Sequence, residues 1–326
     1  MKLIIQIPCL NEALTLPATL ADLPRAIPGI DVIEVLIVDD GSTDGTGEVA
    51  RAHGVPHVVR FRRPKGLAAA FTAGIDACLK QGADIIVNTD GDNQYFGSDI
   101  PRLIEPLLDG RADIVIGDRN IRDLAHMSLA KKFLQRLGSW TVRQVSNTKV
   151  PDTTSGFRAY TREAALRMTI VSDFSYTLET IIQAGKKRMA VAHVEVNTNA
   201  HTRPSRLFSS MFSYIKQSSA TIVRIYAMYE PLKVFTYIGA AIFGAGFLLG
   251  LRLVYYYFKL EAYEHLPSAI AAAVLMIVGF QVLVIGLLAD VISGARKLIE
   301  DLLYRVRAME LRERQTPPAS PETKDR

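Results

Sequence analysis

The sequence predicts an α/β domain with a mainly parallel β-sheet, followed by a hairpin of two transmembrane helices. Three features of the 326-residue chain lead to this expectation. Short β-branched runs alternate with amphipathic stretches through residues 1–204, polar residues stand directly after several of these runs, and two long apolar segments follow residue 231. Alternating strands and helices are typical of a parallel sheet that helices cover on both faces.

The β-branched runs predict strands at 3–7, 32–38, 57–60, 85–89, 114–116 and 189–196. The amphipathic stretches predict helices at 13–23, 43–53, 67–81, 101–108, 128–145 and 175–184. Ligands of such sheets bind at the carboxyl ends of the strands. We therefore expect the site among the polar residues that follow the strands.

Two apolar segments, residues 234–258 and 268–292, are each long enough to cross a bilayer core as helices. The alternative is a pair of buried helices in a soluble protein, which the scarcity of charged residues disfavours. Arg252 and the tyrosines after it suit the membrane interface. Residues 233–292 are therefore predicted to form a transmembrane hairpin.

The flanks of the hairpin are rich in Lys and Arg, whereas the loop 259–267 carries one Lys and two Glu. This distribution predicts that the domain of residues 1–204 and the C-terminus are cytoplasmic and that the hairpin spans the inner (cytoplasmic) membrane. Residues 205–232 are expected to form amphipathic juxtamembrane helices, and residues 293–326 a basic, partly disordered tail. Basic residues beside anionic lipids account for the net charge of +5, so no nucleic-acid partner is inferred.

The strongest local motif follows the apolar run 85–89. Asp90 and Asp92 are separated by Gly91, which lets the backbone approach a ligand closely. Carboxylates at this spacing suit Mg²⁺ or Mn²⁺ shared with a diphosphate, whose charge the cation would offset as the nucleotide departs. The same short pattern also occurs in turns and helix caps, so other motifs must support it.

Two further loops carry polar residues at strand ends. Asp39 and Asp40 end the run 32–38 and could accept hydrogen bonds from a base or a ribose. Helix capping explains Ser42 after them without any function. Lys65 lies in a basic loop before the helix 67–81, where it could meet a phosphate or simply be solvated.

Five ordered motifs carry a resemblance to a known family. They are Pro8-Cys9-Leu10-Asn11-Glu12, Val38-Asp39-Asp40-Gly41-Ser42-Thr43-Asp44, Asp90-Gly91-Asp92-Asn93-Gln94, Gly117-Asp118-Arg119 and Asp152-Thr153-Thr154-Ser155-Gly156-Phe157-Arg158. They resemble the motif series of family 2 glycosyltransferases, within the branch of dolichol-phosphate mannose synthase and bacterial polyprenyl-phosphate glycosyltransferases. The resemblance spans residues 3–210 and implies a GT-A nucleotide-sugar-binding domain over residues 1–204.

The resemblance implies a nucleotide-sugar donor and a divalent metal, Mg²⁺ or Mn²⁺. The expected donor-binding residues are Pro8, Leu10, Asn11, Glu12, Asp39, Asp40, Lys65, Asp90, Gly91 and Arg203. The expected metal ligands are Asp90, Asp92 and Gln94. The segment that begins at Arg203 departs from the usual Arg-x-x-Gly-x-Ser-Lys pattern, because its glycine is absent and Arg206 replaces the lysine.

The resemblance also places a lipid-phosphate acceptor site. Its expected residues are Arg119, Lys131, Lys132, Arg136, Ser139 and Arg158. A phosphate monoester is already anionic at pH 7, so it can attack without a general base. Lys132 and Arg136 would share one helix face, although a solvated amphipathic helix has the same pattern. Asp152 could orient the acceptor or one of these cations, or cap a turn.

Together these expectations describe an inverting transfer of a sugar from a UDP- or GDP-linked donor to polyprenyl phosphate at the cytoplasmic membrane face. Asp92, Asp152 and Arg119 are expected to be catalytic. The alternatives are a membrane-bound glycosyltransferase with another lipid or glycan acceptor, or a non-catalytic sugar-nucleotide-binding scaffold. Small residues of the spans, Gly239, Gly246 and Gly250 among them, would permit association into a homo-oligomer.

Overall fold

The structure is a computed structural model of the chain. It describes residues 1–119, 140–143, 145–171, 176–199, 220, 223–224, 226–258 and 266–315. The chain divides into two compact units. One contains Met1–Ile222 together with Leu302–Arg326, and the other contains Val223–Asp301.

The first unit is built on a seven-stranded sheet with the order β3-β2-β1-β4-β6-β5-β7. The strands are β1 (Lys2–Cys9), β2 (Val32–Asp39), β3 (His57–Arg60), β4 (Ile85–Asn88), β5 (Ile114–Asp118), β6 (Arg158–Thr161) and β7 (Val191–Glu195). All neighbouring strands are parallel except β6, which runs antiparallel to both β4 and β5. The predicted mainly parallel sheet is confirmed, but β6 was not predicted.

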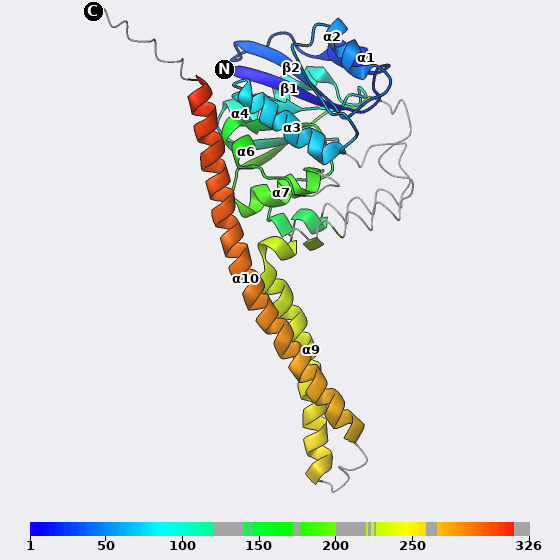
Figure 1. Cartoon of the computed structure of the whole chain (residues 1–326), viewed down its shortest axis with the longest axis vertical. Helices are drawn as coiled ribbons and strands as arrows, with labels where there is room; N and C mark the ends of the chain where they lie inside the picture. Colours follow the sequence, from blue (N-terminus) through cyan, green and yellow to red (C-terminus); the bar gives the residue numbers. More distant parts are fainter. Residues whose placement is uncertain are drawn as a thin grey trace, which may run out of the picture. The chain divides into compact units, whose positions relative to one another are not determined.

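Helices cover both faces of this sheet, and Figure 1 shows α3 on one of them. The helices of the unit are α1 (Leu16–Asp22), α2 (Thr46–Ala52), α3 (Leu67–Lys80), the 3₁₀ turn η1 (Gly97–Asp99), α4 (Ile100–Leu108), α6 (Arg162–Arg167) and α7 (Tyr176–Lys186). Alternate side chains of β1, such as Leu3 and Ile5, form a core with residues of α1, α2 and α4. The opposite face packs on α3, which also contacts α6 and α7. Polar side chains on this second face, such as Gln6, therefore point into the protein.

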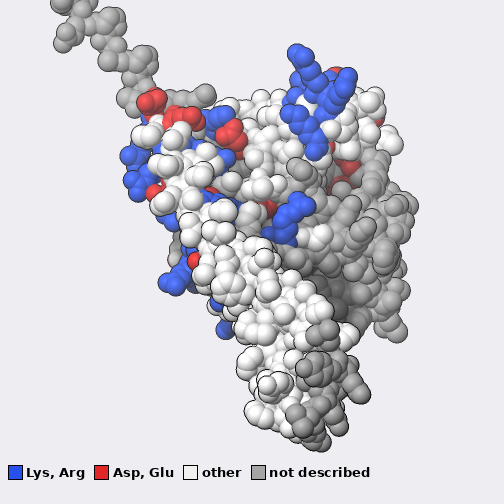
Figure 2. Space-filling view, turned by 60° about the horizontal axis from the view of Figure 1, so that its bottom comes forward, with Lys and Arg blue, Asp and Glu red and all other residues white. Residues whose placement is uncertain are grey.

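The second unit holds most of two long helices, α9 (Pro231–Phe258) and α10 (Leu266–Gln315). Both are long and apolar enough to cross a membrane. Large apolar side chains such as Leu248 and Leu288 are exposed on them, and the hairpin surface that faces the viewer in Figure 2 is almost free of charge. Helix α10 continues beyond residue 292, the predicted end of the second span, to Gln315. Residues 316–326 and most of the segment 205–232 lie outside the described residues.

Glycines bring α9 and α10 into close contact. A Cβ atom added to Gly279 would lie 2.5 Å from the backbone nitrogen of Phe243, and one added to Gly246 would lie 2.8 Å from the Cβ of Leu275. Residues without a side chain at these positions let the two backbones approach, as in other membrane helix pairs. Gly246 thus lies in the contact between α9 and α10, whereas Gly244 and Gly250 face open space.

We expect Gly279→Leu to destabilise the hairpin, and Gly244→Leu to leave it unchanged. The added side chain collides with backbone atoms at the first position and has room at the second, so the free energies of unfolding should differ by roughly 1–3 kcal/mol or more. The melting temperature of the purified protein in detergent measures this. Equal melting temperatures for the two variants would show that the glycine contact does not hold the hairpin.

Candidate active site

The predicted site residues meet at one edge of the sheet, where β1, β2 and β4 end. The register pairs Cys9 with Asp39 across β1 and β2, and Gln6 with Asn88 across β1 and β4. The loops that follow these strands carry Asn11 and Glu12, Asp40, and the acids Asp90 and Asp92. The structure thus brings the donor and metal motifs of the sequence together.

The two acids after β2 order the loops around them. Asp39 is fully buried, and one of its oxygens accepts a hydrogen bond from the Ser42 backbone nitrogen at 2.8 Å. Its other oxygen lies 3.2 Å from Arg60 Nε, without hydrogen-bond geometry. The Asp40 carboxylate accepts hydrogen bonds from the backbone nitrogens of Lys65 at 2.7 Å and Gly66 at 2.9 Å. Asp40 therefore holds the basic loop in place at the start of α3.

The loop after β1 joins two other loops. One follows β4 and carries the predicted metal ligands Asp90, Asp92 and Gln94 (the metal loop), and the other follows β2. The Asn11 side chain accepts a hydrogen bond from the Thr43 backbone nitrogen at 2.9 Å. The Thr15 hydroxyl lies 2.8 Å from Glu12 Oε2 and 2.9 Å from the Gly91 carbonyl oxygen. A Cβ atom on Gly91 would lie 2.9 Å from Cys9 Sγ. Only a glycine therefore lets the loop of Asp90 and Asp92 lie this close to β1.

Negative charge accumulates at the metal motif. Asp90 is half-buried, and burial, followed by the charges of Asp92 and Glu12, raises the pKa of its carboxyl to about 7, with Arg119 opposing the rise. The Asp92 carboxylate accepts a hydrogen bond from the Gln94 backbone nitrogen at 3.1 Å. A divalent cation would relieve the repulsion that this arrangement creates.

The acids fit a metal that the substrate helps to hold. Among the described residues there is no group of three or more His, Cys, Asp or Glu able to hold a metal ion. Asp90 and Asp92 supply hard oxygen ligands, and they leave coordination positions for phosphate oxygens and water, as Mg²⁺ sites commonly do. Asp90, Asp92 and Gln94 would be the protein residues nearest to such a cation.

Two asparagines that were not predicted hold this region: Asn199 bonds to the metal loop, and Asn197 bonds to the turn η1 that follows it. The Asn199 backbone nitrogen donates to the Gln94 carbonyl oxygen at 2.8 Å, and its side chain donates to the Asn93 carbonyl oxygen at 2.9 Å. The Asn197 backbone nitrogen donates to Asp99 at 2.7 Å. The only signal in the sequence was a pair of asparagines, two residues apart, after the predicted strand 189–196.

Arg119, which was predicted to bind the acceptor, and Asp152 form an ion pair. Arg119 Nε donates to one Asp152 oxygen at 2.6 Å and its Nη2 to the other at 3.1 Å, while Nη2 also donates to the Thr154 hydroxyl at 2.8 Å. Burial alone would raise the pKa of Asp152, but the charge and hydrogen bonds of Arg119 lower it below the usual range. Asp152 also accepts a hydrogen bond from the Thr154 backbone nitrogen. It therefore both orients a cation and closes a turn.

Arg158 does not occupy the role predicted for it. Its guanidinium is fully buried beneath the site and donates to the carbonyl oxygens of Ser155, Thr177 and Thr153 and to the Thr180 hydroxyl. With no exposed surface it cannot reach a lipid phosphate in this structure. The predicted contact with the acceptor is therefore wrong here, and Arg158 instead ties β6 and the turn before it to α7.

The structure also describes three other residues that were predicted to bind the donor. Pro8 is buried in β1, and Leu10 is 37% exposed after it. Lys65 is exposed, and its ammonium group lies 4.7 Å from the centre of the Phe61 ring. The other predicted donor and acceptor residues, Lys131, Lys132, Arg136, Ser139 and Arg203, lie outside the described residues.

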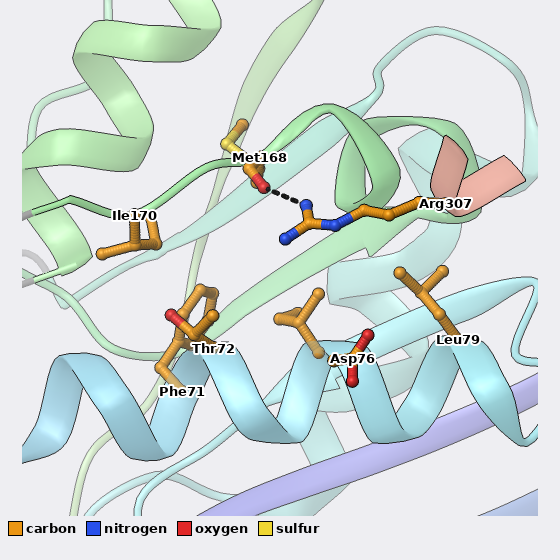
Figure 3. Close-up of a pocket in the computed structure, with 8 residues that line it drawn as sticks. Phe71, Thr72, Asp76, Leu79, Met168, Ile170 and Arg307 are labelled. Atoms are coloured by element: carbon orange, nitrogen blue, oxygen red, sulfur yellow. Dashed lines mark hydrogen bonds between the residues drawn. The ribbon is translucent and has the colours of Figure 1, made fainter. Parts of the chain in front are cut away.

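A separate cavity lies between α3, the segment after α6 and the end of α10 (Figure 3). The Arg307 guanidinium points into it and donates to the Met168 carbonyl oxygen at 3.1 Å. None of the predicted site residues lines this cavity. Its side chains are mostly apolar, and all of its lining residues belong to the first unit.

Comparison with known proteins agrees with this geometry. Residues 4–168 match the family described as "Glycosyl transferase family 2", and residues 230–295 match the "GtrB C-terminal hairpin". An undecaprenyl-phosphate mannosyltransferase of Micrococcus luteus is 32% identical over 204 residues, which cover 60% of this chain and 82% of the relative. An undecaprenyl-phosphate 4-deoxy-4-formamido-L-arabinose transferase of Aeromonas hydrophila is 26% identical over 88% of this chain and 87% of its own length.

A solved structure supports the same fold. The glucosyl-3-phosphoglycerate synthase of Mycobacterium tuberculosis, crystallised with Mn²⁺, UDP-glucose and phosphoglyceric acid, has a TM-score of 0.56 at 23% identity. The match covers 69% of this chain and 80% of that one. The fold is thus the GT-A fold that the sequence predicted, with two long apolar helices after it. From the family match over residues 4–168, the chain is a glycosyltransferase and belongs to glycosyl transferase family 2.

Proposed function

We propose that this enzyme transfers a sugar from a nucleotide-sugar to polyprenyl phosphate, with inversion, at the cytoplasmic face of the inner membrane. The observation that carries the proposal is the position of the Arg119 guanidinium, which Asp152 and Thr154 hold by hydrogen bonds. Its positive charge opposes the rise in the pKa of the Asp90 carboxyl, so the guanidinium lies near that acid. A site for an anionic acceptor thus adjoins the acids that would hold the donor diphosphate through a metal.

The donor side uses the loops after β1, β2 and β4. Asp40 and the loop of Asn11 and Glu12 form the wall where the nucleoside would bind, with Leu10 beside it, and the buried Asp39 and Pro8 support this wall from behind. Asp90, Asp92 and Gln94 would hold Mg²⁺ or Mn²⁺, which supplies positive charge to the departing diphosphate. The Mn²⁺ and UDP-glucose named with the structural relative support a metal-assisted donor site of this kind.

The acceptor side needs a cation rather than a base. The lipid phosphate already carries the negative charge with which it attacks. Arg119 makes no hydrogen bond through Nη1 to any residue that the structure describes, so this nitrogen can donate to a phosphate oxygen. Lys131, Lys132, Arg136 and Ser139 remain predicted partners of the same phosphate.

Holding the acceptor opposite the leaving diphosphate allows one displacement at the anomeric carbon, which inverts its configuration. A phosphate oxygen forms the new bond to this carbon, the old bond to the diphosphate breaks, and the electron pair leaves with the nucleotide. No side chain has to take a proton. Asp152 can therefore serve to hold Arg119 rather than act as a general base.

The relatives support the lipid more than the sugar. Undecaprenyl phosphate stands in the names of two relatives that transfer different sugars. The apolar surface of α9 and α10 supports a membrane-bound acceptor. The surplus of Lys and Arg on both flanks of the hairpin supports a cytoplasmic location for the residues before its first span and after its second.

A donor screen tests the proposal. Full-length protein in detergent is incubated with undecaprenyl phosphate, Mn²⁺ or Mg²⁺, and a panel of UDP- and GDP-sugars labelled in the sugar. We expect one donor to give metal-dependent label in the lipid extract. Label that appears only in a water-soluble glycan or in free sugar would reject the acceptor assignment.

The raised pKa of Asp90 predicts how the metal stabilises the protein as pH changes. Its folded pKa of about 7 exceeds the ordinary value of 3.8, so without metal its contribution to stability is largest below the ordinary value and is lost as pH rises through 7. A cation binds the ionised form. The increase in melting temperature that Mn²⁺ causes should therefore be larger at about pH 8 than at about pH 6.

Asp90→Asn should remove this pH dependence, because the amide does not titrate in this range. Asp109→Asn, at an exposed carboxylate at the end of α4, should keep it. Thermal melts of the three proteins with and without Mn²⁺ provide the measurement. Identical Mn²⁺ effects at both pH values in the wild-type protein would contradict a metal at Asp90.

A further inference from the structure

A buried tyrosine lies directly beneath the candidate active site. Tyr176, the first residue of α7, has no exposed surface. Its hydroxyl accepts a hydrogen bond from Asn88 Nδ2 at 2.9 Å and lies 3.4 Å from the Gly156 carbonyl oxygen, to which it donates. Asn88 Nδ2 also donates to the same carbonyl oxygen at 2.8 Å. Gly156 is thus held from below by two side chains.

Gly156 in turn lies close to the carboxylate of Asp90. A Cβ atom added to Gly156 would lie 3.1 Å from each Asp90 oxygen and 3.1 Å from the Tyr176 hydroxyl. Its φ is not in the left-handed region, so the backbone does not itself require a glycine. The close approach requires it. The position of Gly156 therefore sets how closely the turn that begins at Asp152 approaches the metal acid.

The groups beneath Gly156 form a rigid foundation. Gln6 Nε2 donates to Asn88 Oδ1 at 2.8 Å, and both side chains are fully buried. The Phe71 ring of α3 stacks on the Tyr176 ring, with centres 3.9 Å apart and planes at 4°. Gln6 Oε1 has no hydrogen-bond partner among the described residues, but the hydrogen bonds through Asn88 and the stacked rings leave the Tyr176 side chain little freedom to move. The Tyr176 hydroxyl therefore has a fixed position.

We propose that Tyr176 is a positioning residue, whose hydroxyl acts with Asn88 to hold Gly156 against the Asp90 carboxylate. It thereby sets the spacing between the metal acids and the turn of Asp152 and Thr154, which orients Arg119. This role rests on the proposed function, because it joins the donor metal to the acceptor cation. Tyr176 itself need not touch either substrate.

A second tyrosine of the same cluster provides a matched control. Tyr160 on β6 is also fully buried, and its ring centre lies 5.9 Å from that of Phe71. Arg158 and Thr180 offset part of the rise in its pKa that burial causes, yet its hydroxyl has no partner with hydrogen-bond geometry among the described residues. Tyr176→Phe and Tyr160→Phe therefore each remove one buried hydroxyl, and only the first removes a contact with the site.

The test compares Mn²⁺ binding to the full-length variants in detergent, with UDP and with GDP present. The electron paramagnetic resonance signal of free Mn²⁺ gives the dissociation constant. Loss of the two hydrogen bonds of the Tyr176 hydroxyl predicts that Tyr176→Phe weakens Mn²⁺ binding roughly fivefold to tenfold, and that Tyr160→Phe changes it less than about twofold. Equal affinities for Tyr176→Phe and the wild-type protein would overturn the proposal.

Gly156→Ala is a second variant, which disturbs the Asp90 carboxylate directly rather than through Tyr176. The methyl group presses on the Asp90 carboxylate while the Tyr176 hydroxyl remains, so Mn²⁺ binding should again weaken at least about fivefold. This variant decides the question if Tyr176→Phe does not fold. Wild-type affinity in Gly156→Ala would contradict the role of Gly156, and with it the proposal.

Lipid transfer assays on the same variants separate this proposal from the proposed function. If the wild-type protein forms no sugar-lipid but Tyr176→Phe still weakens Mn²⁺ binding, the positioning role stands and the lipid acceptor is wrong. If the wild-type protein forms the lipid and Tyr176→Phe alters neither Mn²⁺ affinity nor transfer, only the positioning role falls. If the wild-type protein binds no Mn²⁺ with either nucleotide, the metal site and the positioning role are both wrong.

Discussion

Asp92→Asn should lower the turnover number of sugar transfer by about 10³-fold, because it removes one of the two carboxylates that would hold the metal. A metal supplies several kcal/mol to a transition state with charge on a leaving diphosphate, and each 1.36 kcal/mol corresponds to about a factor of ten. The substitution keeps the shape of the side chain, and the hydrogen bond from the Gln94 backbone nitrogen can go to its amide oxygen. Initial rates of label transfer at saturating donor measure the loss.

Asp109→Asn is the control for this experiment. Asp109 is half exposed at the end of α4, pairs with Arg111 and is not among the predicted site residues. Its variant should retain the wild-type rate. If Asp92→Asn were as active as Asp109→Asn, the metal-assisted mechanism would be wrong.

Arg119→Lys should lower kcat/KM for polyprenyl phosphate by about 100-fold while leaving nucleotide binding unchanged. Lysine keeps the positive charge, but it cannot span both Asp152 oxygens as the guanidinium does at 2.6 and 3.1 Å. Truncating one partner of a buried charged pair usually costs about 2–5 kcal/mol, and the retained charge places this variant at the lower end. Steady-state kinetics with varied lipid, together with a binding titration with the nucleotide diphosphate, separate the two effects.

Arg111→Lys is the matched substitution at an exposed pair, since Arg111 contacts Asp109 at the surface. It should leave both measurements at wild-type values. An equal loss in acceptor and donor parameters for Arg119→Lys would indicate that Arg119 serves the donor or the fold rather than the acceptor phosphate.

The long apolar runs made most of the fold predictable. Strand β3 has the predicted bounds, and β1, β2, β4, β5 and β7 differ from them by a few residues at their ends. Strand β6 was missed because it is four residues long and begins with an arginine, so neither periodicity nor hydrophobicity marks it. Its antiparallel pairing with β4 and β5 buries Arg158, and only tertiary structure reveals that environment.

The site was predictable where chemistry and strand ends coincide. Asp39, Asp40, Asp90 and Asp92 each follow an apolar run, and the parallel sheet brings their loops to one edge. The supporting residues gave no such signal. Asn199 acts mainly on backbone carbonyl oxygens that are more than 100 residues distant in sequence, and Tyr176 reaches Gly156 from α7.

The proposed reaction moves a sugar, without its phosphate, from a nucleotide to a polyprenyl phosphate. It is tested most directly with a donor that carries one isotope in the sugar and a second in the phosphate attached to that sugar. We expect the sugar label in the lipid product and the phosphate label in the released nucleoside diphosphate. Both labels in the lipid would mean that a sugar phosphate is transferred, and the absence of both from the lipid would reject polyprenyl phosphate as the acceptor.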